Sequence, residues 1–168
     1  LPAATAVGTK SGPLQLMFLA GTQPGTHLGN PRQLNAYECP RHYGPRSPSF
    51  ARATLTRSEE ECRLYLAGTA SVVGHASRHA GLPRQQTEET IRNIQAVFEQ
   101  AKHAAAFDLI GTQRQALYKV YVRDSATHAE IQDAIMNSTL SLEHVLFLHG
   151  DLCRKELLVE IEGLVISG

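Results

Sequence analysis

The feature that most constrains this chain is an alternation of aliphatic residues close to its C-terminus, over residues 157–166. Period two predicts a β-strand with one buried face, made by Leu157, Val159, Ile161 and Val165. The opposite face then carries two carboxylates among aliphatic side chains: Leu158, Glu160, Glu162, Leu164 and Ile166. Apolar surroundings disfavour the charged form of a carboxyl and raise its pKa, as a general acid near neutral pH requires. The same pattern also fits two carboxylates that simply face solvent.

Composition narrows the class of protein. The chain has 168 residues, which suits one domain or one domain with an extension, and 16 basic residues balance 16 acidic ones. We therefore expect neither a nucleic-acid nor a membrane partner. The three cysteines are widely spaced and form no Cys-x-x-Cys pair, which indicates a reducing, cytoplasmic setting and no metal site. The chain begins at Leu1 rather than Met, so we expect a piece of a longer protein.

Residues 1–60 are rich in proline and glycine, and we interpret them as a loop-rich segment that contributes to the active site. The apolar run 14–19 predicts one strand here. Residues 21–52 then read as a long loop, which in a compact domain is often functional. Its guanidinium and aromatic groups could bind a planar anion, and the candidate binding residues are Tyr37, Tyr43 and Arg52. Alternatively, the loop could be a solvated linker.

Residues 61–168 read as one regular α+β domain. Alternation predicts strands at 62–73, 116–123, 142–148 and 157–166, and helical periodicity predicts helices at 87–106, capped by Thr87, and at 127–138, capped by Ser125 or Thr127. Gly68 inside the first strand indicates a bulge or a close approach to the backbone. Short crossovers place both helices on one face of the sheet.

The two faces of this sheet differ in chemistry. We expect the helices to cover Val120, Val122, Val159 and Ile161. The other face carries a mixture of charged and aromatic groups, which predicts an assembly interface or a ligand pocket: Lys119, Tyr121, Arg123, Glu160 and Glu162.

The order of elements and the ending Val159-Glu160-Ile161-Glu162-Gly163 resemble the YjgF-like, chorismate-mutase-like fold, whose members are trimers with ligand clefts between subunits. A more specific resemblance is to the chorismatases. It is carried by motifs within residues 30–53, by Gly68-Thr69-Ala70-Ser71-Val72-Val73-Gly74-His75, by Val120-Tyr121-Val122-Arg123, and by Cys153 followed seven residues later by Glu160. The chain resembles the C-terminal half of that family, which implies an N-terminal partner domain, or a trimer.

The resemblance implies cleavage of chorismate with release of pyruvate, and no metal or organic cofactor. Glu160 matches the family's catalytic glutamate and would protonate the enolpyruvyl methylene carbon. Arg52 and Arg123 are the candidates for the two substrate carboxylates, with Tyr43 and Tyr37 orienting the ring or a hydroxyl. Gly68 and Cys153 match positions that mark the branch of the family that forms hydroxybenzoate, which favours 3-hydroxybenzoate, with 4-hydroxybenzoate as a second product.

Three other functions remain open at this stage. One is chorismate hydrolysis to a dihydroxycyclohexadiene carboxylate. Another is imine or enamine deamination, for which the broader fold family uses an arginine just ahead of the last strand; residues 144–149 contain none. The last is a non-catalytic binding or assembly module, because a fold does not determine a function. Cys153 as a nucleophile and His75 as a catalyst are weaker ideas, since a lone cysteine usually packs as a small apolar residue.

Overall fold

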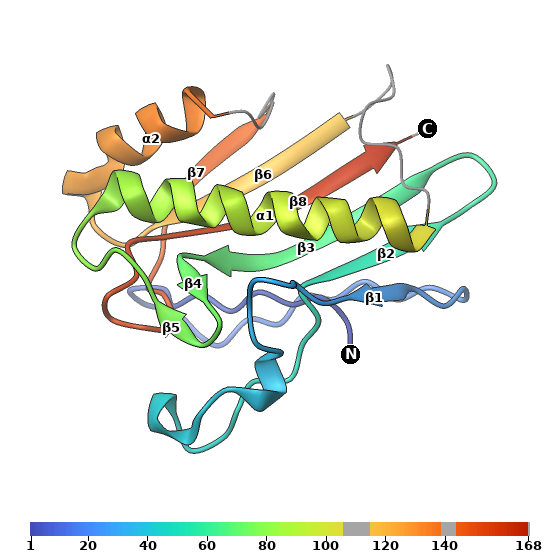
Figure 1. Ribbon diagram of the computed structural model, residues 1–168, viewed down its shortest axis with the longest axis horizontal. Coiled ribbons are helices and arrows are strands. Elements are labelled where there is room, and N and C mark those ends of the chain that lie inside the picture. The colour runs from blue at the N-terminus through green and yellow to red at the C-terminus, as the bar shows by residue number, and fades with distance from the viewer. Residues whose placement is uncertain (106–114, 139–143, 168) are drawn as a thin grey trace.

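The computed structural model describes residues 1–105, 115–138 and 144–167. Six strands of this part form one mixed sheet in the order β1-β2-β3-β8-β6-β7 (Figure 1). Their bounds are β1 Thr26–Leu28, β2 Ala53–Arg57, β3 Cys62–Ala70, β6 Gln115–Val122, β7 Val145–His149 and β8 Val159–Ser167. Neighbouring strands are antiparallel except for β6 and β7, which are parallel. A small hairpin, β4 Val72–Val73 and β5 Ala76–Ser77, stands beside the sheet.

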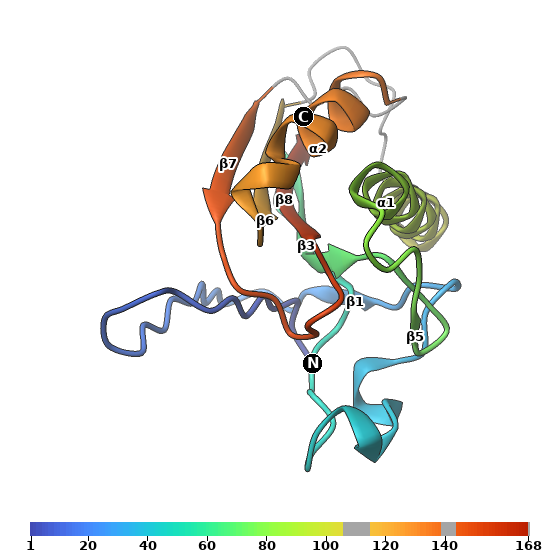
Figure 2. The same cartoon turned by 90° about the vertical axis from the view of Figure 1, so that its left-hand side faces the viewer.

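Both long helices, α1 Pro83–Ala105 and α2 His128–Met136, lie on the same face of the sheet, as Figure 2 shows with the sheet seen edge-on. The core between them contains the four residues expected there: Val120, Val122, Val159 and Ile161. The predicted α+β class and the placement of the helices are therefore confirmed. None of the helices in the described part of the chain combines the length and the apolar character needed to span a membrane.

Several boundaries differ from the sequence prediction. Helix α1 begins at Pro83, because proline lacks the N–H that a first helical residue leaves unpaired and has the right φ. Thr87 therefore lies inside the helix, where its hydroxyl bonds the carbonyl of Pro83 at 2.8 Å, and does not cap it. Thr127 occupies the position before α2 without a capping hydrogen bond from its side chain. The predicted residues 106 and 142–143 lie outside the described residues.

The strand predicted at 14–19 is wrong. Leu14 is 99% and Phe18 81% exposed, and no described strand pairs with this run. An apolar sequence forms a strand only where a neighbour accepts its backbone hydrogen bonds, and a sequence pattern cannot supply that neighbour. The sheet instead recruits β1 and β2 from residues 1–60, so this segment contributes two strands to the sheet. The predicted strand 62–73 is split, because β3 ends at Ala70 and residues 72–73 turn away into the hairpin.

Helix α1 has a second buried face, which is polar. Asn93 is fully buried; its amide donates to the carbonyls of Ala70 at 3.0 Å and Val72 at 2.9 Å, and its Oδ1 accepts from Arg32 Nε at 2.9 Å. Gln86, also fully buried, donates to the carbonyl of Glu156 at 2.8 Å and accepts from the N–H of Leu158 at 2.8 Å. These amides attach the β4–β5 hairpin and the β7–β8 loop to the helix.

We expect Asn93→Leu to lower the free energy of unfolding by roughly 1–3 kcal/mol, the usual cost of leaving a buried polar group unpaired. The substitution keeps the branched shape of the side chain, although leucine is somewhat larger, and removes the bonds to Ala70, Val72 and Arg32. Urea unfolding followed by circular dichroism measures the change. Gln100→Leu, at an exposed position of the same helix, is the matched control and should stay within about 0.5 kcal/mol of the parent chain.

Candidate active site

Glu160 is the centre of the candidate site. It lies in β8, paired with Ala70 on one side and Tyr121 on the other, and only 5% of it is exposed. Its neighbours Val159 and Ile161 point into the helix-covered core, so the carboxyl lies on the face that the helices leave uncovered. A carboxylate on an open sheet face would normally be solvated. Its burial therefore needs a cause on that face.

Gly68 provides part of the space for this carboxyl. The register between β3 and β8 shifts between Leu66 and Thr69, which is the bulge that Gly68 indicated in the sequence. A Cβ atom at Gly68 would lie 2.2 Å from Oε1 and 3.0 Å from Cδ of Glu160. The Glu160 carboxyl therefore lies directly over the Gly68 backbone, at a distance that only glycine permits.

An N-terminal strap, residues 3–8, crosses the uncovered face and encloses the same point. The N–H of Ala3 donates to Thr54 Oγ1 at 2.7 Å, and Gly8 exchanges two backbone hydrogen bonds of 2.8 Å with Asp151. Between them, Thr5 Oγ1 accepts from the N–H of Gly68 at 2.8 Å. Sequence reasoning missed the strap, because nothing in its short, small residues indicates where it binds.

We expect Gly68→Ala to displace the Glu160 carboxyl. The added methyl would also lie 2.8 Å from Thr5 Cγ2, so neither neighbour can keep its position. Overpacking of this kind typically costs about 1–3 kcal/mol. Thermal unfolding measures the loss, and Gly21→Ala, where a Cβ meets nothing within 4 Å, is the control. Equal melting temperatures for the two variants would contradict this close approach.

The surroundings of Glu160 favour its protonated form. Burial is the main cause, and the negative charge of Glu162 adds to it; together they raise the pKa of Glu160 to about 7, although the Arg52 guanidinium acts in the opposite direction. No described residue donates a hydrogen bond to this carboxyl. An acid with a pKa near 7 is half protonated at neutral pH and can deliver its proton to a bound molecule.

Glu162, two residues along the same face, has the opposite electrostatics. Its Oε1 accepts from Lys119 Nζ at 2.8 Å and from the Tyr121 hydroxyl at 2.8 Å. Burial acts to raise the pKa of Glu162, but hydrogen bonds from Lys119, Thr5 and Tyr121 outweigh it and lower that pKa below its usual value. The two carboxylates share a face, as the alternation predicts, but only Glu160 has the pKa of an acid at neutral pH.

Arg52 directly precedes β2 and points into the same region. Its Nη2 donates to the carbonyl of Leu34 at 3.0 Å, and its guanidinium lies 5.0 Å from the centre of the Phe50 ring. Its Nε is buried and has no partner among the described residues. Burial lowers the pKa of Arg52, while Cys39, Cys153 and Glu160 raise it through their charges. A half-buried guanidinium without a carboxylate partner among the described residues is suited to bind one.

A second guanidinium, Arg154, was missed by the sequence analysis. It lies 3.7 Å above the ring of Tyr43, donates to the carbonyl of His75 at 2.7 Å, and approaches Cys39 Sγ at 3.6 Å. Its positive charge lowers the pKa of Arg52, so the two cations are close enough to interact. Neither forms a salt bridge within the described part of the chain. The available signal was a basic residue directly after Cys153, on the loop that leads into β8.

Arg123 has a different environment from the one we expected. Its Nε donates to the carbonyl of Leu157 at 2.7 Å, its Nη2 donates to Leu152 at 2.8 Å and Arg154 at 2.9 Å, and its Nη1 pairs with Asp151. Four N–H groups are thus used to hold the β7–β8 loop. Arg123 is consequently an anchor for the loop that carries Cys153 and Arg154, and four of its N–H groups are already in use.

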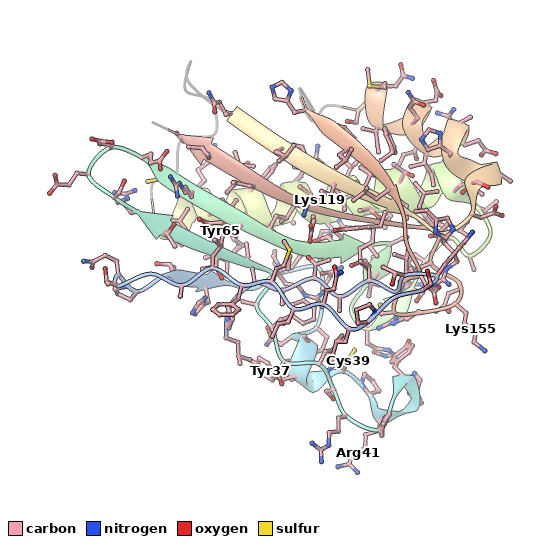
Figure 3. The ribbon with its side chains drawn as sticks, turned by 180° about the vertical axis from the view of Figure 1, so that it is seen from behind. Tyr37, Cys39, Arg41, Tyr65, Lys119 and Lys155 are labelled. Carbon is pink, nitrogen blue, oxygen red and sulfur yellow. The ribbon has the colours of Figure 1, made fainter. Side chains whose placement is uncertain are left out.

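The two candidate tyrosines lie on a lobe, residues 35–47, that projects beneath the sheet (Figure 1). Tyr43 lies under Arg154, and its hydroxyl is 3.4 Å from His75 Nδ1. Tyr37 is 54% exposed and bonds no described residue through its hydroxyl; Figure 3 shows it on the same lobe as Cys39 and Arg41. The structure therefore brings Tyr43 to the cationic pair and gives Tyr37 no comparable contact.

Cys153 lies among the same charges. Burial raises the pKa of the Cys153 thiol, and Glu160 raises it further, against the effect of Arg154 and Arg52. A thiol in this state is neutral, whereas a nucleophilic cysteine requires the thiolate. Cys153 remains an exposed residue of the β7–β8 loop, so it is not a core packing residue, but its neutral thiol is poorly suited to nucleophilic attack. The arrangement as a whole offers a protonated carboxyl, two guanidiniums and a tyrosine, which can hold and protonate an anionic substrate.

Comparisons with known proteins identify relatives over nearly the whole length of the chain. No family model matches the chain. It is 37% identical over 98% of its length to a 3-hydroxybenzoate synthase from Streptomyces hygroscopicus, of which it covers 51%, and 37% identical to a chorismatase from the same organism, of which it covers 49%. The chain thus spans about half the length of these relatives.

Solved structures give the same result. A crystal structure of a chorismatase matches 85% of this chain and 44% of its own, with a TM-score of 0.75 and 32% identity. RidA from an Antarctic Psychrobacter matches 71% of this chain with a TM-score of 0.52 and 17% identity, which concerns the fold alone. Both resemblances drawn from the sequence motifs, to the chorismatases and to the YjgF-like (RidA) fold, are confirmed.

Proposed function

We propose that this chain, which is related to the chorismatase and 3-hydroxybenzoate synthase family over nearly its whole length, cleaves chorismate to pyruvate and a hydroxybenzoate. The observation that carries the proposal is the buried carboxyl of Glu160, with a pKa near 7, beside two guanidiniums that lack a carboxylate partner among the described residues. Chorismate is a dianion with an enol ether, so its cleavage needs both features.

The chemistry begins with a proton transfer to carbon. Glu160 donates its proton to the methylene carbon of the enolpyruvyl group, which converts the enol ether into an oxocarbenium-like centre. Water can add to that centre, and the resulting hemiketal collapses to pyruvate and a ring hydroxyl. Alternatively, the bond between the ring carbon and the ether oxygen breaks, and that oxygen leaves as the keto oxygen of pyruvate. Only 5% of Glu160 is exposed, so little bulk water reaches the acid before the substrate does.

Arg52 and Arg154 hold the carboxylates in this proposal. Each guanidinium presents N–H groups in a planar fork that fits a carboxylate, and a bound anion would relieve the repulsion between the two cations. Arg154 replaces Arg123 in this role. In this proposal Tyr43 contacts the ring or its hydroxyl, which its position under Arg154 supports.

The product we propose is 3-hydroxybenzoate, with 4-hydroxybenzoate as a second product. Gly68 lies directly against the Glu160 carboxyl, and Cys153, seven residues before Glu160, is close enough for the charge of Glu160 to raise the pKa of its thiol. A small residue and a neutral thiol leave room for a ring to lose its hydroxyl and become aromatic. This route consumes no net water, whereas hydrolysis to a dihydroxycyclohexadiene carboxylate consumes a water molecule.

The test is to incubate the full chain with chorismate, to measure pyruvate, and to identify the ring product by chromatography. Equal amounts of pyruvate and hydroxybenzoate support the proposal. Formation of a dihydroxycyclohexadiene carboxylate would agree with Glu160 as the general acid but would overturn the proposed ring product. Absence of pyruvate would overturn the proposed activity for this chain alone. The assay would then be repeated with a separately expressed N-terminal half of a relative, which shows whether a partner domain is required.

One observation favours a second candidate, the deamination of an imine or enamine. The sequence argument against it was the lack of an arginine at 144–149, but Arg154 does lie ahead of β8 in the structure. Release of ammonia from a small 2-imino acid, without cleavage of chorismate, would favour this reaction.

A trimer and a cytoplasmic location stay predictions, the first from the resemblance and the second from the cysteine content.

A further inference from the structure

We propose that Glu162 is a positioning residue for Glu160: its negative charge, fixed by Lys119 and Tyr121, holds the proton on the neighbouring carboxyl. The kinetic part of this inference rests on the proposed function, but its electrostatic part does not.

The register of the strands fixes this charge. Lys119 lies directly opposite Glu162 across the β6–β8 pair, and Tyr121 lies opposite Glu160. Tyr121 nevertheless directs its hydroxyl diagonally to Glu162, so both donors reach the same oxygen, Oε1, at 2.8 Å. Figure 3 shows Lys119 on the uncovered sheet face. The diagonal reach of Tyr121 satisfies Glu162 and leaves Glu160 without a donor among the described residues.

The charges around the two carboxyls then separate their roles. The side chain of Glu162 faces Lys119 and is 18% exposed. Four groups face Glu160: Glu162 from β8, Arg52 ahead of β2, Cys153 from the β7–β8 loop, and Tyr121 from β6. Burial and Glu162 raise the pKa of Tyr121, so the phenol stays a neutral donor. When one proton is shared between two nearby carboxyls, it resides where the negative charge is least stabilised, which is Glu160.

The experiment follows the carboxyl carbon of Glu160 by NMR in the protein without substrate, over pH 4 to about 9. We expect Glu162→Gln to lower the midpoint of Glu160 by about one pH unit, the usual effect of removing a close like charge. Lys119→Met should raise the upper midpoint of the pair, because the counter-charge of Glu162 is lost. Glu59→Gln, in the exposed turn between β2 and β3 at the far end of the sheet, is the control and should leave the midpoint unchanged.

Opposite shifts in the two variants support the inference, because a general loss of structure would move both midpoints the same way. An unchanged midpoint in folded Glu162→Gln overturns it. If that variant does not fold, the direction of the shift in Lys119→Met decides. Kinetics form a separate arm: if the parent chain releases pyruvate, the alkaline limit of its rate should move with the NMR midpoint. Shifted midpoints in a chain that does not cleave chorismate would support the positioning role and overturn only the proposed function.

Discussion

Glu160→Gln is expected to lower the release of pyruvate from chorismate by about 10²–10⁴-fold, the usual contribution of general acid catalysis. Glutamine keeps the size and the polarity of the side chain, so it fits over Gly68, but it has no proton that it can give to carbon. The loss should appear in kcat. Binding of chorismate, measured by calorimetry, should survive, because the guanidiniums and not the acid hold the substrate.

The pH dependence of the rate tests the same role of Glu160. An acid must be protonated to act, so the rate of the parent chain should fall as pH rises through about 7, the pKa of Glu160. Glu160→Gln should lose that limb of the profile along with the rate. Glu59→Gln removes a carboxylate from an exposed turn and should keep both. A folded Glu160→Gln variant with the parent's rate would remove Glu160 from the mechanism.

The regular part of the fold could be predicted because its patterns are local. Period two on β6 and β8 and the apolar stripe of α1 each determine a face, and short connections then leave one arrangement of helices. The failures concern segments whose structure depends on distant partners. Residues 14–19 have the composition of a strand but pair with no strand in the described part of the chain, whereas β1 has three residues and forms only because β2 lies beside it.

The candidate site divides in the same way. Glu160 follows from alternation, and Gly68 from the rule that a glycine within a strand marks a bulge or a close approach. The direction of a long side chain does not follow from its strand position alone. Arg123 lies where β6 ends, and its donors turn under the β7–β8 loop. Arg154 comes from that loop, and its place over Tyr43 depends on bonds to the β4–β5 hairpin region, residues 75–77.

The second large effect is expected from Arg52→Gln. If this guanidinium holds a substrate carboxylate in a buried setting, its removal should cost about 2–5 kcal/mol of binding to substrate and transition state, or roughly 30- to 5,000-fold in kcat/KM. Glutamine is shorter than arginine and gives up the bond from Nη2 to the carbonyl of Leu34, so the folding of the variant is checked together with its kinetics. Steady-state assays with chorismate and circular dichroism of the same samples separate binding from folding.

Two other arginines make this test specific. Arg41 belongs to the lobe of residues 35–47, which also carries Tyr43, and points away from the molecule (Figure 3). Arg41→Gln therefore removes an equal charge and should leave kcat/KM within about twofold, since an exposed charge is screened by solvent and salt. Arg123→Gln should lower the melting temperature, because four hydrogen bonds of the β7–β8 loop depend on its guanidinium. If Arg123→Gln instead left stability unchanged and abolished chorismate binding, while Arg52→Gln bound normally, the carboxylate would lie on the β6 side of Glu160. The cationic pair of Arg52 and Arg154 would then have another ligand.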